Sequence, residues 1–302
     1  MIGEGWHVTV LDNLSRPGTE RNLKWLTTHH PNHMTFVNED VRNATALSNH
    51  VKRQDAILHL AGQVAVTTSL LDPVTDFDVN AGGTVNLLEA ARQHNPDAPF
   101  VFASTNKVYG KLDKNNVACK ETQPIDFHSP YGCSKGAADQ YVRDYARCYH
   151  MNTVVLRQSC IYGAHQDGTE DQGWVAHFVH SILNDRPLTI YGDGRQVRDL
   201  LDARDLSALY ETVINNIDKT KGEIYNVGGG PPNQRNLLDV IDQIRELTGK
   251  VPQYAFADWR EGDQSYYVSD ITKANRDLGW EPQVPFDNGL KDLIAWAAST
   301  TG

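Results

Sequence analysis

Tyr131 and Lys135 are the residues of this sequence that most directly suggest chemistry, because they lie four positions apart. Pro130 before them suits the first turn of a helix, and the residues that follow favour helix, so both side chains would lie on one helical face. A free phenol has a pKa of ~10, and work as a base near neutral pH needs a fall of roughly three units, which a neighbouring ammonium and a bound cationic ring can supply. The pair indicates hydride-transfer chemistry, although the same spacing also arises by chance in helices.

The residues upstream of this pair predict a strand that brings further polar groups to it. Residues 100–102 form an apolar run typical of a buried parallel strand, and the run leads to Ser104 and Thr105. Because ligands of open α/β sheets sit at the carboxyl ends of the strands, we expect both hydroxyls to face the crevice that holds Tyr131. The alternative for each hydroxyl is to cap a loop.

The composition favours an ordinary globular protein that binds small molecules. With 302 residues, of which 40% are hydrophobic and 22% charged, the chain can bury a substantial core. A formal net charge of −10 disfavours nucleic acid and anionic membranes as partners. The four cysteines lack C-x-x-C spacing, the twelve histidines lack metal-ligand spacing, and neither a signal peptide nor a long apolar span is present, so we expect no disulfide, no metal and a cytoplasmic location.

Strand-like and helix-like segments alternate along the first half of the chain. The apolar runs lie at residues 8–11, 34–37, 56–60, 100–102 and 153–156. They are separated by stretches such as 85–91 that favour helix, and this rhythm predicts an α/β fold with a Rossmann-like doubly wound parallel sheet. Later helices are expected near 237–248 and 288–298. We therefore expect a cofactor domain at 1–157 and a smaller substrate-binding lobe at 158–302, some of whose segments return to the sheet.

The beginning of the sequence departs from this pattern. In a dinucleotide fold, the first strand ends in a glycine-rich turn that places the pyrophosphate at a helix N-terminus. Here residues 1–6 are typical of the end of a helix and lead directly into what would be the second strand, and no G-x-G-x-x-G precedes a helix elsewhere. We therefore expect the first strand and its turn, about twenty residues, to be missing.

Asp12 is the clearest cofactor residue that remains. A carboxylate at the end of this strand accepts hydrogen bonds from both ribose hydroxyls of adenosine and repels a 2′-phosphate, which favours NAD over NADP. Arg16 nearby weakens this preference, and a turn-forming role is the alternative for Asp12. Further cofactor contacts are expected from Asn13, Ser15, Asp40, Val41, Leu60, Ala61, Gly62, Gln63 and Ser104.

Several longer strings resemble the extended short-chain dehydrogenase/reductase family of nucleotide-sugar epimerases and dehydratases, nearly end to end. The strings are residues 12–19, 59–65, 104–110, 126–141, 171–174 and 258–264. Within the family they are most similar to enzymes that epimerise a CDP-linked sugar at C2. The resemblance implies NAD as cofactor, Tyr131 as acid/base, Lys135 as a ligand of the nicotinamide ribose that also lowers the pKa of Tyr131, and Thr105 as a partner of the reacting sugar hydroxyl. It also implies a homodimer and a cofactor-pocket role for Asn80, whose alternative is a helix cap.

The resemblance also implies the substrate contacts. Arg198 and Arg260 correspond to the family's diphosphate clamp, for which planar and always-charged guanidinium groups are well suited. Asp263 would accept a hydrogen bond from a ribose hydroxyl or the base, and ordinary surface charge is the alternative for all three residues. The other implied contacts with a nucleotide sugar, with a CDP-sugar favoured, are Thr105, Asn106, Gln158, Cys160 and Gln172.

Two positions narrow the expected reaction. Dehydratases of the family carry Asp-Glu after the active-site Thr, whereas this chain has Asn106 and Lys107, so dehydration is disfavoured. Galactose-type UDP-sugar 4-epimerases usually carry Asn at the position of Cys160, so a 2-epimerase is favoured over that rival enzyme. A non-catalytic nucleotide-sugar-binding relic is the rival of another class, because the glycine-rich turn is missing. His165, where close relatives usually have Arg, is a second departure.

Overall fold

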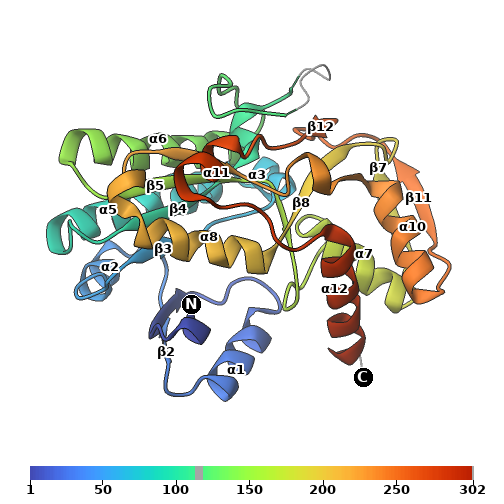
Figure 1. The fold of residues 1–302 in the computed structure, drawn as a ribbon, viewed down its shortest axis with the longest axis horizontal. Coiled ribbons are helices and arrows are strands. Elements are labelled where there is room, and N and C mark those ends of the chain that lie inside the picture. The colour runs from blue at the N-terminus through green and yellow to red at the C-terminus, as the bar shows by residue number, and fades with distance from the viewer. Residues whose placement is uncertain (113–117, 301–302) are drawn as a thin grey trace.

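The computed structural model describes residues 1–112 and 118–300 (Figure 1). Its centre is a sheet of four parallel strands. In their spatial order, the strands are β3 (Ile57–His59), β4 (Phe100–Thr105), β5 (Thr153–Gln158) and β9 (Ile224–Val227). The connections between them run through helices, as parallel pairing requires. The predicted α/β fold with a parallel sheet is confirmed.

Helices cover both faces of this sheet, which explains why its strands are apolar along their length. On one face, α5 (Gly83–His94) and α6 (Pro130–Tyr149) share a buried cluster with Phe100 and Phe102. On the other face, α8 (Ala203–Asn215) covers the alternate side chains of the same strands. Figure 1 shows α6 and α8 on opposite sides of β4 and β5.

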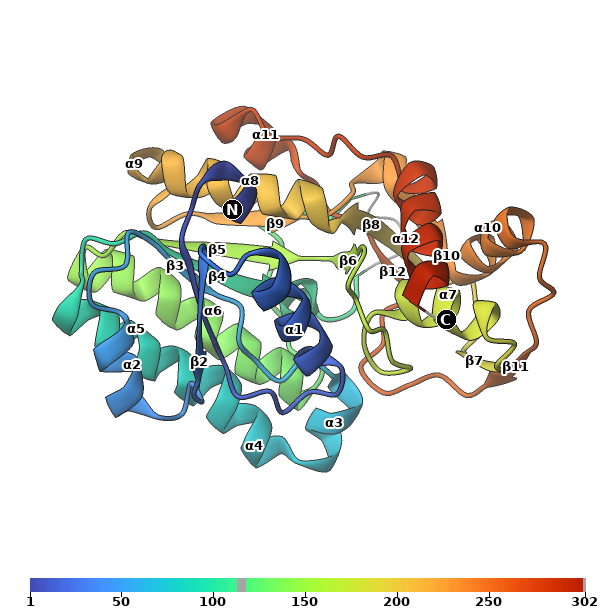
Figure 2. The same ribbon diagram turned by 90° about the horizontal axis from the view of Figure 1, so that it is seen from below.

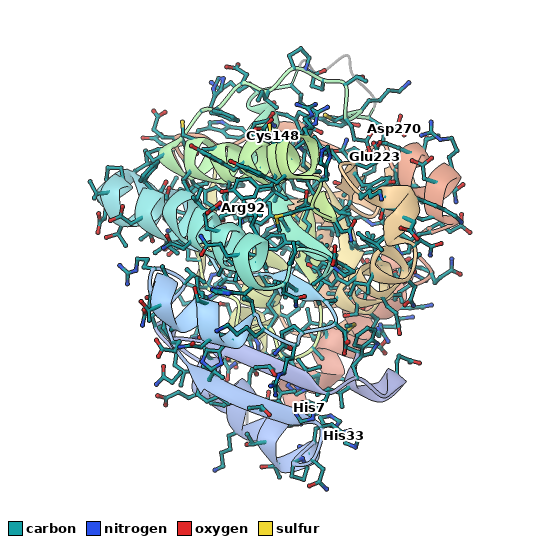
Figure 3. All side chains as sticks on the ribbon, turned by 90° about the vertical axis from the view of Figure 1, so that its left-hand side faces the viewer. His7, His33, Arg92, Cys148, Glu223 and Asp270 are labelled. Carbon is teal, nitrogen blue, oxygen red and sulfur yellow. The ribbon has the colours of Figure 1, made fainter. Side chains whose placement is uncertain are left out.

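Two further parallel strands form a separate sheet. They are β1 (Val8–Asp12) and β2 (Met34–Asn38), which are connected by α1 (Thr19–His29). Figure 3 marks this sheet by His7 and His33, each of which directly precedes one of the strands. The strands predicted in these two segments are therefore confirmed, although they do not pair with the central sheet.

A cavity of about 400 Å³ lies between β1 and β3. Its lining includes Val8, Val10 and Leu11 from β1 and Leu58 from β3. Within residues 1–112 and 118–300, no strand pairs with the edges of β1 and β3 that border this cavity. A largely apolar cavity therefore separates the two sheets.

Short helices follow β3 and β4 at their carboxyl ends. They are α3 (Val66–Leu71), α4 (Pro73–Phe77), the π-helical turn η2 (Asp78–Gly82) and the 3₁₀ turn η3 (Asn106–Tyr109), whereas α2 (Ala44–His50) precedes β3. The turn η2 continues directly into α5 and carries Asn80. Single π-helical turns are frequent at functional sites. This arrangement brings several short segments to the end of the sheet at which Tyr131 lies.

The second half of the chain builds a smaller assembly beside the central sheet. Its strands are β6 (Cys160–Tyr162), β7 (Leu188–Tyr191), β8 (Val197–Asp202), β10 (Gln234–Asn236), β11 (Tyr254–Ala257) and β12 (Tyr266–Tyr267). Around an apolar cluster, α7 (Trp174–Leu183), α10 (Leu237–Thr248) and α12 (Phe286–Thr300) pack on β7 and β8. Figure 2 shows these three helices grouped on the right, away from α5 and α6. The helices predicted near 237–248 and 288–298 are confirmed.

Some later segments pack on the central sheet instead. They are α8, β9 and α11 (Thr272–Leu278), whose apolar side chains join the cluster that includes Val101. The remaining short elements are η1 (Ile2–Glu4), α9 (Ile217–Thr220) and η4 (Pro231–Asn233). Among the helices of the described segments, none is long and apolar enough to cross a membrane.

Candidate active site

Tyr131 and Lys135 lie in the first turns of α6, next to the carboxyl end of β4. Ser129 caps this helix by accepting a hydrogen bond from the backbone of its first turn at 3.1 Å, and Pro130 is the first helical residue. The backbone N–H of Tyr131 donates to Ser69 Oγ on α3 at 3.1 Å. The helix therefore begins where Pro130 predicts, and α3 and the cap hold the start of the helix in place.

The phenol of Tyr131 is buried in a site that favours its neutral form. Burial raises the pKa of Tyr131 to about 12, a hydrogen bond with Thr105 opposes this shift, and the charge of Asp76 adds to it. The lowering that was expected from Lys135 is not found in the protein alone. In the absence of a cofactor, Tyr131 is therefore a protonated phenol in contact with Thr105.

The ammonium group of Lys135 is directed at the strand rather than at the phenol. Its Nζ donates to the carbonyl oxygen of Ala103 at 2.6 Å and lies 4.3 Å from the ring centre of Phe102. Burial lowers the pKa of Lys135 to about 8. A lysine with this pKa is neutral before the Tyr131 phenol ionises, so Lys135 supplies no positive charge that would lower the pKa of Tyr131 in this state.

The two hydroxyls at the end of β4 have different partners, because successive residues of a strand face opposite sides. Thr105 contacts Tyr131 and also caps η3. Ser104 Oγ donates to Asp139 Oδ2 at 2.7 Å, and Asp139 forms a buried ion pair with Arg157 at 2.8 Å. The expectation that both hydroxyls face the crevice of Tyr131 therefore needs correction for Ser104, which supports the ion pair.

Asn80 connects the loop after β3 to α6. Its Oδ1 accepts from the backbone N–H of Gln63 at 2.9 Å, and its Nδ2 lies 3.0 Å from Ser134 Oγ. Asn80 sits inside η2 with 1% of its surface exposed and does not cap a helix. A Cβ at Gly62 would lie 2.8 Å from Asn80 Oδ1 and 3.8 Å from Lys135 Nζ, so only glycine lets this loop come so close.

The residues expected near adenosine lie at the ends of β1 and β2. Asp12 Oδ1 accepts from the backbone N–H of Leu14 at 2.7 Å, which is the turn-forming contact considered as its alternative. Asn13 Nδ2 donates to Asp40 Oδ2 at 2.8 Å, and Asn13 Oδ1 accepts from the N–H of Ser15 at 3.0 Å. The segment is thus organised by its own polar side chains.

Asp40 is bound by Arg42 through two hydrogen bonds of 2.9 and 2.8 Å. The Arg42 guanidinium holds the pKa of Asp40 far below its usual range. The neighbouring Val41 is buried, and a Cβ at Gly83 would meet its side chain at 2.6 Å. Leu60 and Ala61 line the cavity between β1 and β3 together with Asp12.

These positions allow a test of whether a dinucleotide fits. Carboxylates at the ends of β1 and β2 suit ribose hydroxyls, and the close approach at Gly62 brings the backbone of the loop near Lys135 Nζ. Within the part of the chain that the structure describes, no G-x-G-x-x-G turn leads into a helix. The residues present therefore fit the adenosine and nicotinamide ends of a dinucleotide, whereas a glycine-rich seat for its pyrophosphate is not among them.

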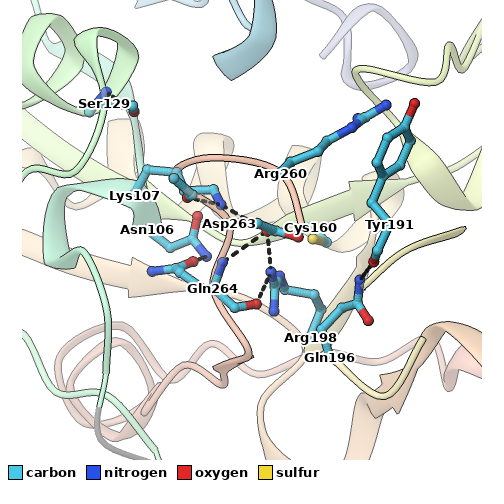
Figure 4. Close-up of polar contacts among 12 residues, drawn as sticks. Asn106, Lys107, Ser129, Cys160, Tyr191, Gln196, Arg198, Arg260, Asp263 and Gln264 are labelled. Carbon is cyan, nitrogen blue, oxygen red and sulfur yellow. Dashed lines mark hydrogen bonds and ion pairs between the residues drawn. The ribbon is translucent and has the colours of Figure 1, made fainter. Parts of the chain in front are cut away.

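Three charged residues, Lys107, Arg198 and Asp263, form a compact cluster (Figure 4). Asp263 Oδ1 lies 2.8 Å from Arg198 Nη2 and 3.3 Å from Lys107 Nζ. Burial opposes ionisation of Asp263, yet the two cations hold its pKa below the usual value. Two positive charges against one negative charge leave a net positive charge, which suits an anionic group such as a diphosphate.

Arg260 lies in a second charged cluster with different partners (Figure 4). Its guanidinium carbon lies 3.7 Å from the ring centre of Tyr191, and its Nη1 donates to the backbone oxygen of Glu170 at 2.9 Å. The carboxylates of Glu170 and Asp171 lie 3.4 and 3.5 Å from the guanidinium. Arg198 and Arg260 therefore do not share a carboxylate.

The remaining residues expected at the substrate side have protein partners. Asn106 Nδ2 donates to Gln264 Oε1 at 3.3 Å, and Gln158 Nε2 donates to the hydroxyl of Tyr210 at 2.7 Å. Gln264 is a site residue that the sequence did not reveal, because an isolated glutamine in a loop carries no distinctive spacing.

Cys160 and Gln172 lie near the start of α7. Trp174 Nε1 donates to Cys160 Sγ at 3.5 Å, and burial raises the pKa of this thiol. Gln172 forms a backbone bridge with Thr169. Across residues 1–112 and 118–300, no group of three or more His, Cys, Asp or Glu side chains is arranged to hold a metal ion.

Two buried residues near Tyr131 and Lys135 were also not singled out from the sequence. Asp76 and Ser134 both contact Asn80 Nδ2, at 3.1 and 3.0 Å. The spacing of Asp76 and Asn80, four positions apart, could have indicated a shared helical face. Ser134 directly precedes Lys135, and no sequence pattern indicated a contact of its side chain with Asn80.

Comparison with known proteins agrees with this geometry. Residues 1–293 match the family described as GDP-mannose 4,6 dehydratase. The chain is 41% identical to CDP-paratose 2-epimerase from Salmonella typhi, over 99% of this chain and 94% of that protein. Among solved structures, UDP-glucose 4-epimerase from Thermotoga maritima with UDP-glucose has a TM-score of 0.89 at 28% identity, covering 100% of this chain and 94% of its own. The complex of Thermus thermophilus UDP-glucose 4-epimerase with NAD has a TM-score of 0.88 at 31% identity, covering 99% and 94%. This chain therefore belongs to the GDP-mannose 4,6 dehydratase family of extended short-chain dehydrogenases/reductases, which comprises nucleotide-sugar epimerases and dehydratases.

Proposed function

We propose that this chain is an NAD-dependent nucleotide-sugar epimerase that interconverts CDP-paratose and CDP-tyvelose by inversion at C2. The observation that carries the proposal is the placement of Tyr131 and Lys135 in the first turns of α6, at the carboxyl end of β4, where Thr105 ends the strand and Lys135 Nζ donates to Ala103 O. A hydroxyl next to a phenol gives the reacting sugar hydroxyl a place between two groups that exchange protons with it. NAD, when bound, supplies the acceptor and then the donor of the hydride.

The residues of this chain then handle the proton and the sugar. Tyr131, ionised with help from the cationic cofactor ring, takes the proton of the C2 hydroxyl as the C2 hydride leaves, which produces a 2-keto sugar. Thr105 orients that oxygen through its own hydroxyl. After the keto sugar has turned over in the pocket, Tyr131 would return the proton to the C2 oxygen while the bound cofactor would supply the hydride to the other face of C2. The reaction leaves no net oxidation.

The residues after Thr105 support epimerisation over dehydration. Elimination of water needs an additional acid and base near the sugar. The two positions after Thr105 are Asn106 and Lys107, so neither carries a carboxylate. Asn106 donates to Gln264, and Lys107 donates to Gly262 O and to Asp263. The 41% identity to a CDP-paratose 2-epimerase favours C2 and a CDP-linked sugar.

We propose that NAD binds along a set of residues that begins at Asp12, at the end of β1, and ends at Lys135 on α6. Asp12 and Asn13 would contact the adenosine ribose, with Ser15, Asp40 and Val41 beside them. The loop Leu60, Ala61, Gly62 and Gln63, with Asn80 behind it, would face the centre of the cofactor, and Lys135 would contact the nicotinamide ribose. Arg198 and Arg260 would hold the diphosphate of the substrate, and Asp263, Asn106, Gln158, Cys160 and Gln172 would surround its nucleotide and sugar.

The experiment is an assay of the purified chain with NAD and three substrates, CDP-paratose, CDP-glucose and UDP-glucose, with the product sugars identified by NMR. We expect conversion of CDP-paratose with inversion at C2. Conversion of UDP-glucose at C4 alone would instead identify a UDP-sugar 4-epimerase. This rival remains a candidate because two similar solved structures are UDP-glucose 4-epimerases. Absence of conversion together with absence of NAD binding would identify a non-catalytic nucleotide-sugar-binding protein.

A homodimer is proposed from the exposed apolar side chains on α3 and α4. Leu71, Val74 and Phe77 are 88, 68 and 57% exposed, and both helices pack beside α6, which carries the exposed Tyr141. A second copy of the chain would cover this surface.

The four free cysteines fit a reducing cytoplasm, which we propose as the location.

A further inference from the structure

Asp76 is a buried carboxyl group beside the acid/base pair to which the proposed reaction gives no role. It lies on α4 with 1% of its surface exposed, although both Asp72 and Asp78 nearby are exposed. Its Oδ1 lies 3.1 Å from Asn80 Nδ2. Its Oδ2 is buried without a donor at hydrogen-bond geometry, although Ser134 lies close enough to lower the pKa of the carboxyl group. A buried acceptor without a donor is costly, so this group calls for an explanation.

The hydrogen bonds around Asp76 contain fewer donors than acceptors. Asn80 Nδ2 carries two hydrogens but lies within 3.1 Å of three acceptors, namely Gln63 O, Asp76 Oδ1 and Ser134 Oγ. The single hydrogen of Ser134 is within reach of the carbonyl oxygen of Tyr131 at 3.2 Å. Asp76 Oδ2 adds one more acceptor. The network is therefore short of donors, and the negative charge of Asp76 is only partly offset by the hydrogen bonds around it.

This network ends at the acid/base pair. Ser134 lies between Tyr131 and Lys135 in sequence, and its hydroxyl joins Asn80 to the backbone of Tyr131. The negative charge of Asp76 acts on both catalytic groups, because it raises the pKa of Tyr131 and favours the ammonium of Lys135. Burial in turn raises the pKa of Asp76 itself, against the opposing effects of Ser134 and, less strongly, of Lys135.

The charged groups around Asp76 are few. Tyr131 and Lys135 face it from α6, and Asp72 and Asp78 lie near the ends of its own helix, exposed to solvent. Residues of α3, which packs against α4, are all uncharged. Asp76 is therefore the carboxyl group through which this side of the site influences the phenol.

We propose that Asp76 is a positioning residue for the acid/base pair, whose buried carboxylate holds Asn80 and Ser134 in place and puts a fixed negative charge on this side of the site. It keeps Tyr131 protonated until the cofactor ring and the substrate are in place, since a negative charge on Asp76 and one on Tyr131 are mutually unfavourable. The inference rests on the proposed function only in taking Tyr131 as the acid/base.

The decisive variant is Asp76→Asn, which removes the charge and keeps the shape. Tyrosine isotope-labelled at Cζ reports ionisation of each phenol by carbon NMR in the protein without cofactor or substrate, and Tyr131→Phe identifies the signal of Tyr131. We expect Asp76→Asn to lower the pKa of Tyr131 by about one unit, which is a tenfold larger phenolate fraction at a given pH. Asp78→Asn, an exposed carboxyl two residues away, should leave the signal unchanged.

An unchanged or raised pKa of Tyr131 in Asp76→Asn would overturn the inference. If Asp76→Asn does not fold, as judged by circular dichroism, Asp76→Ser removes the same charge with a smaller side chain and must give the same direction. In the active enzyme, the acid limb of the kcat/KM profile should move to lower pH in Asp76→Asn, which a purely structural role would not cause. Because the NMR titration needs neither NAD nor a nucleotide sugar, its outcome is independent of whether the proposed reaction is correct.

Discussion

The start of α6, which carries Tyr131, is held by neutral groups, whereas Arg198 and Arg260 are held by carboxylates. The start of α6 is fixed by Ser69 and by the helix cap, and Lys135 binds a strand carbonyl. By contrast, Arg198 pairs with Asp263, and Arg260 pairs with Glu170 and Asp171. The two regions thus satisfy their buried polar groups by different means.

This contrast identifies the part of the site that is ready before a ligand binds. Hydrogen bonds between secondary-structure elements keep the acid/base geometry without help from a ligand. The ion pairs around Arg198 can rearrange around an entering phosphate, because Lys107 and Arg198 together carry one positive charge more than Asp263. We therefore expect changes in the first region to affect rate and folding, and changes in the second region to affect affinity.

The strongest test of this contrast is Tyr131→Phe. Without its hydroxyl the residue cannot take or return the substrate proton, so we expect turnover to fall by about 10²–10⁴-fold. Nucleotide-sugar affinity, measured by calorimetry, should stay within a factor of about two because the clamp is untouched. Tyr141→Phe is the matched control, since Tyr141 lies on the same helix and is exposed. Substantial residual turnover in Tyr131→Phe would refute its role.

The buried ion pair behind the acid/base region gives the next largest effect. Arg157 and Asp139 are 3 and 0% exposed, and Ser104 binds the same carboxylate. Replacement Arg157→Met leaves this charge without its partner, so the free energy of unfolding should fall by about 3–5 kcal/mol in urea denaturation. The double variant Arg157→Met/Asp139→Leu should recover part of the loss. No recovery would mean that packing, and not the unpaired charge, causes the effect.

The pH dependence of stability tests the burial of Lys135. Its pKa of about 8 in the folded protein lies below the ordinary value of ~10.4, so the unfolded chain binds the proton more tightly. Stability contributed through this group therefore rises with pH between these two values, by roughly 3 kcal/mol at most. The unfolding free energy of Lys135→Met minus that of the unsubstituted chain should therefore become more negative by that amount as the pH rises from about 8 to ~10.4. Exposed Lys52→Met should show a constant difference, and a constant difference for Lys135→Met would contradict the burial effect.

The smallest effect is expected at the diphosphate clamp. Removal of the guanidinium in Arg260→Leu should weaken CDP binding by about tenfold, as one charge-assisted contact is lost, while CMP binding changes little. Exposed Arg186→Leu on the same half of the molecule is the control. Equal losses for CDP and CMP would show that Arg260 acts through the fold of its loop and not through the second phosphate.

The elements of the fold were predictable where local pattern and burial agree. The apolar runs at β3, β4 and β5 are buried on both faces, so the sequence shows them as continuous hydrophobic stretches. The start of α6 was predictable because Pro130 and Ser129 act locally. The separation of β1 and β2 from the central sheet was not, since strand pairing depends on which edges meet in space.

Local sequence was sufficient to indicate a Tyr and Lys pair on one helical face and a strand end with hydroxyls, whereas the arginines suited to a diphosphate were predicted from the family resemblance. Spacing along one helix or strand is a local property, and residues 131 and 135 cannot avoid sharing a face once the helix forms. Tertiary packing alone pairs Ser104 with the Asp139–Arg157 ion pair, lets Lys107 and Arg198 share Asp263, and buries Asp76 beside the acid/base pair. Those partners are far apart in the chain or on other faces, so their contacts and the resulting pKa shifts follow from packing, which no local pattern contains.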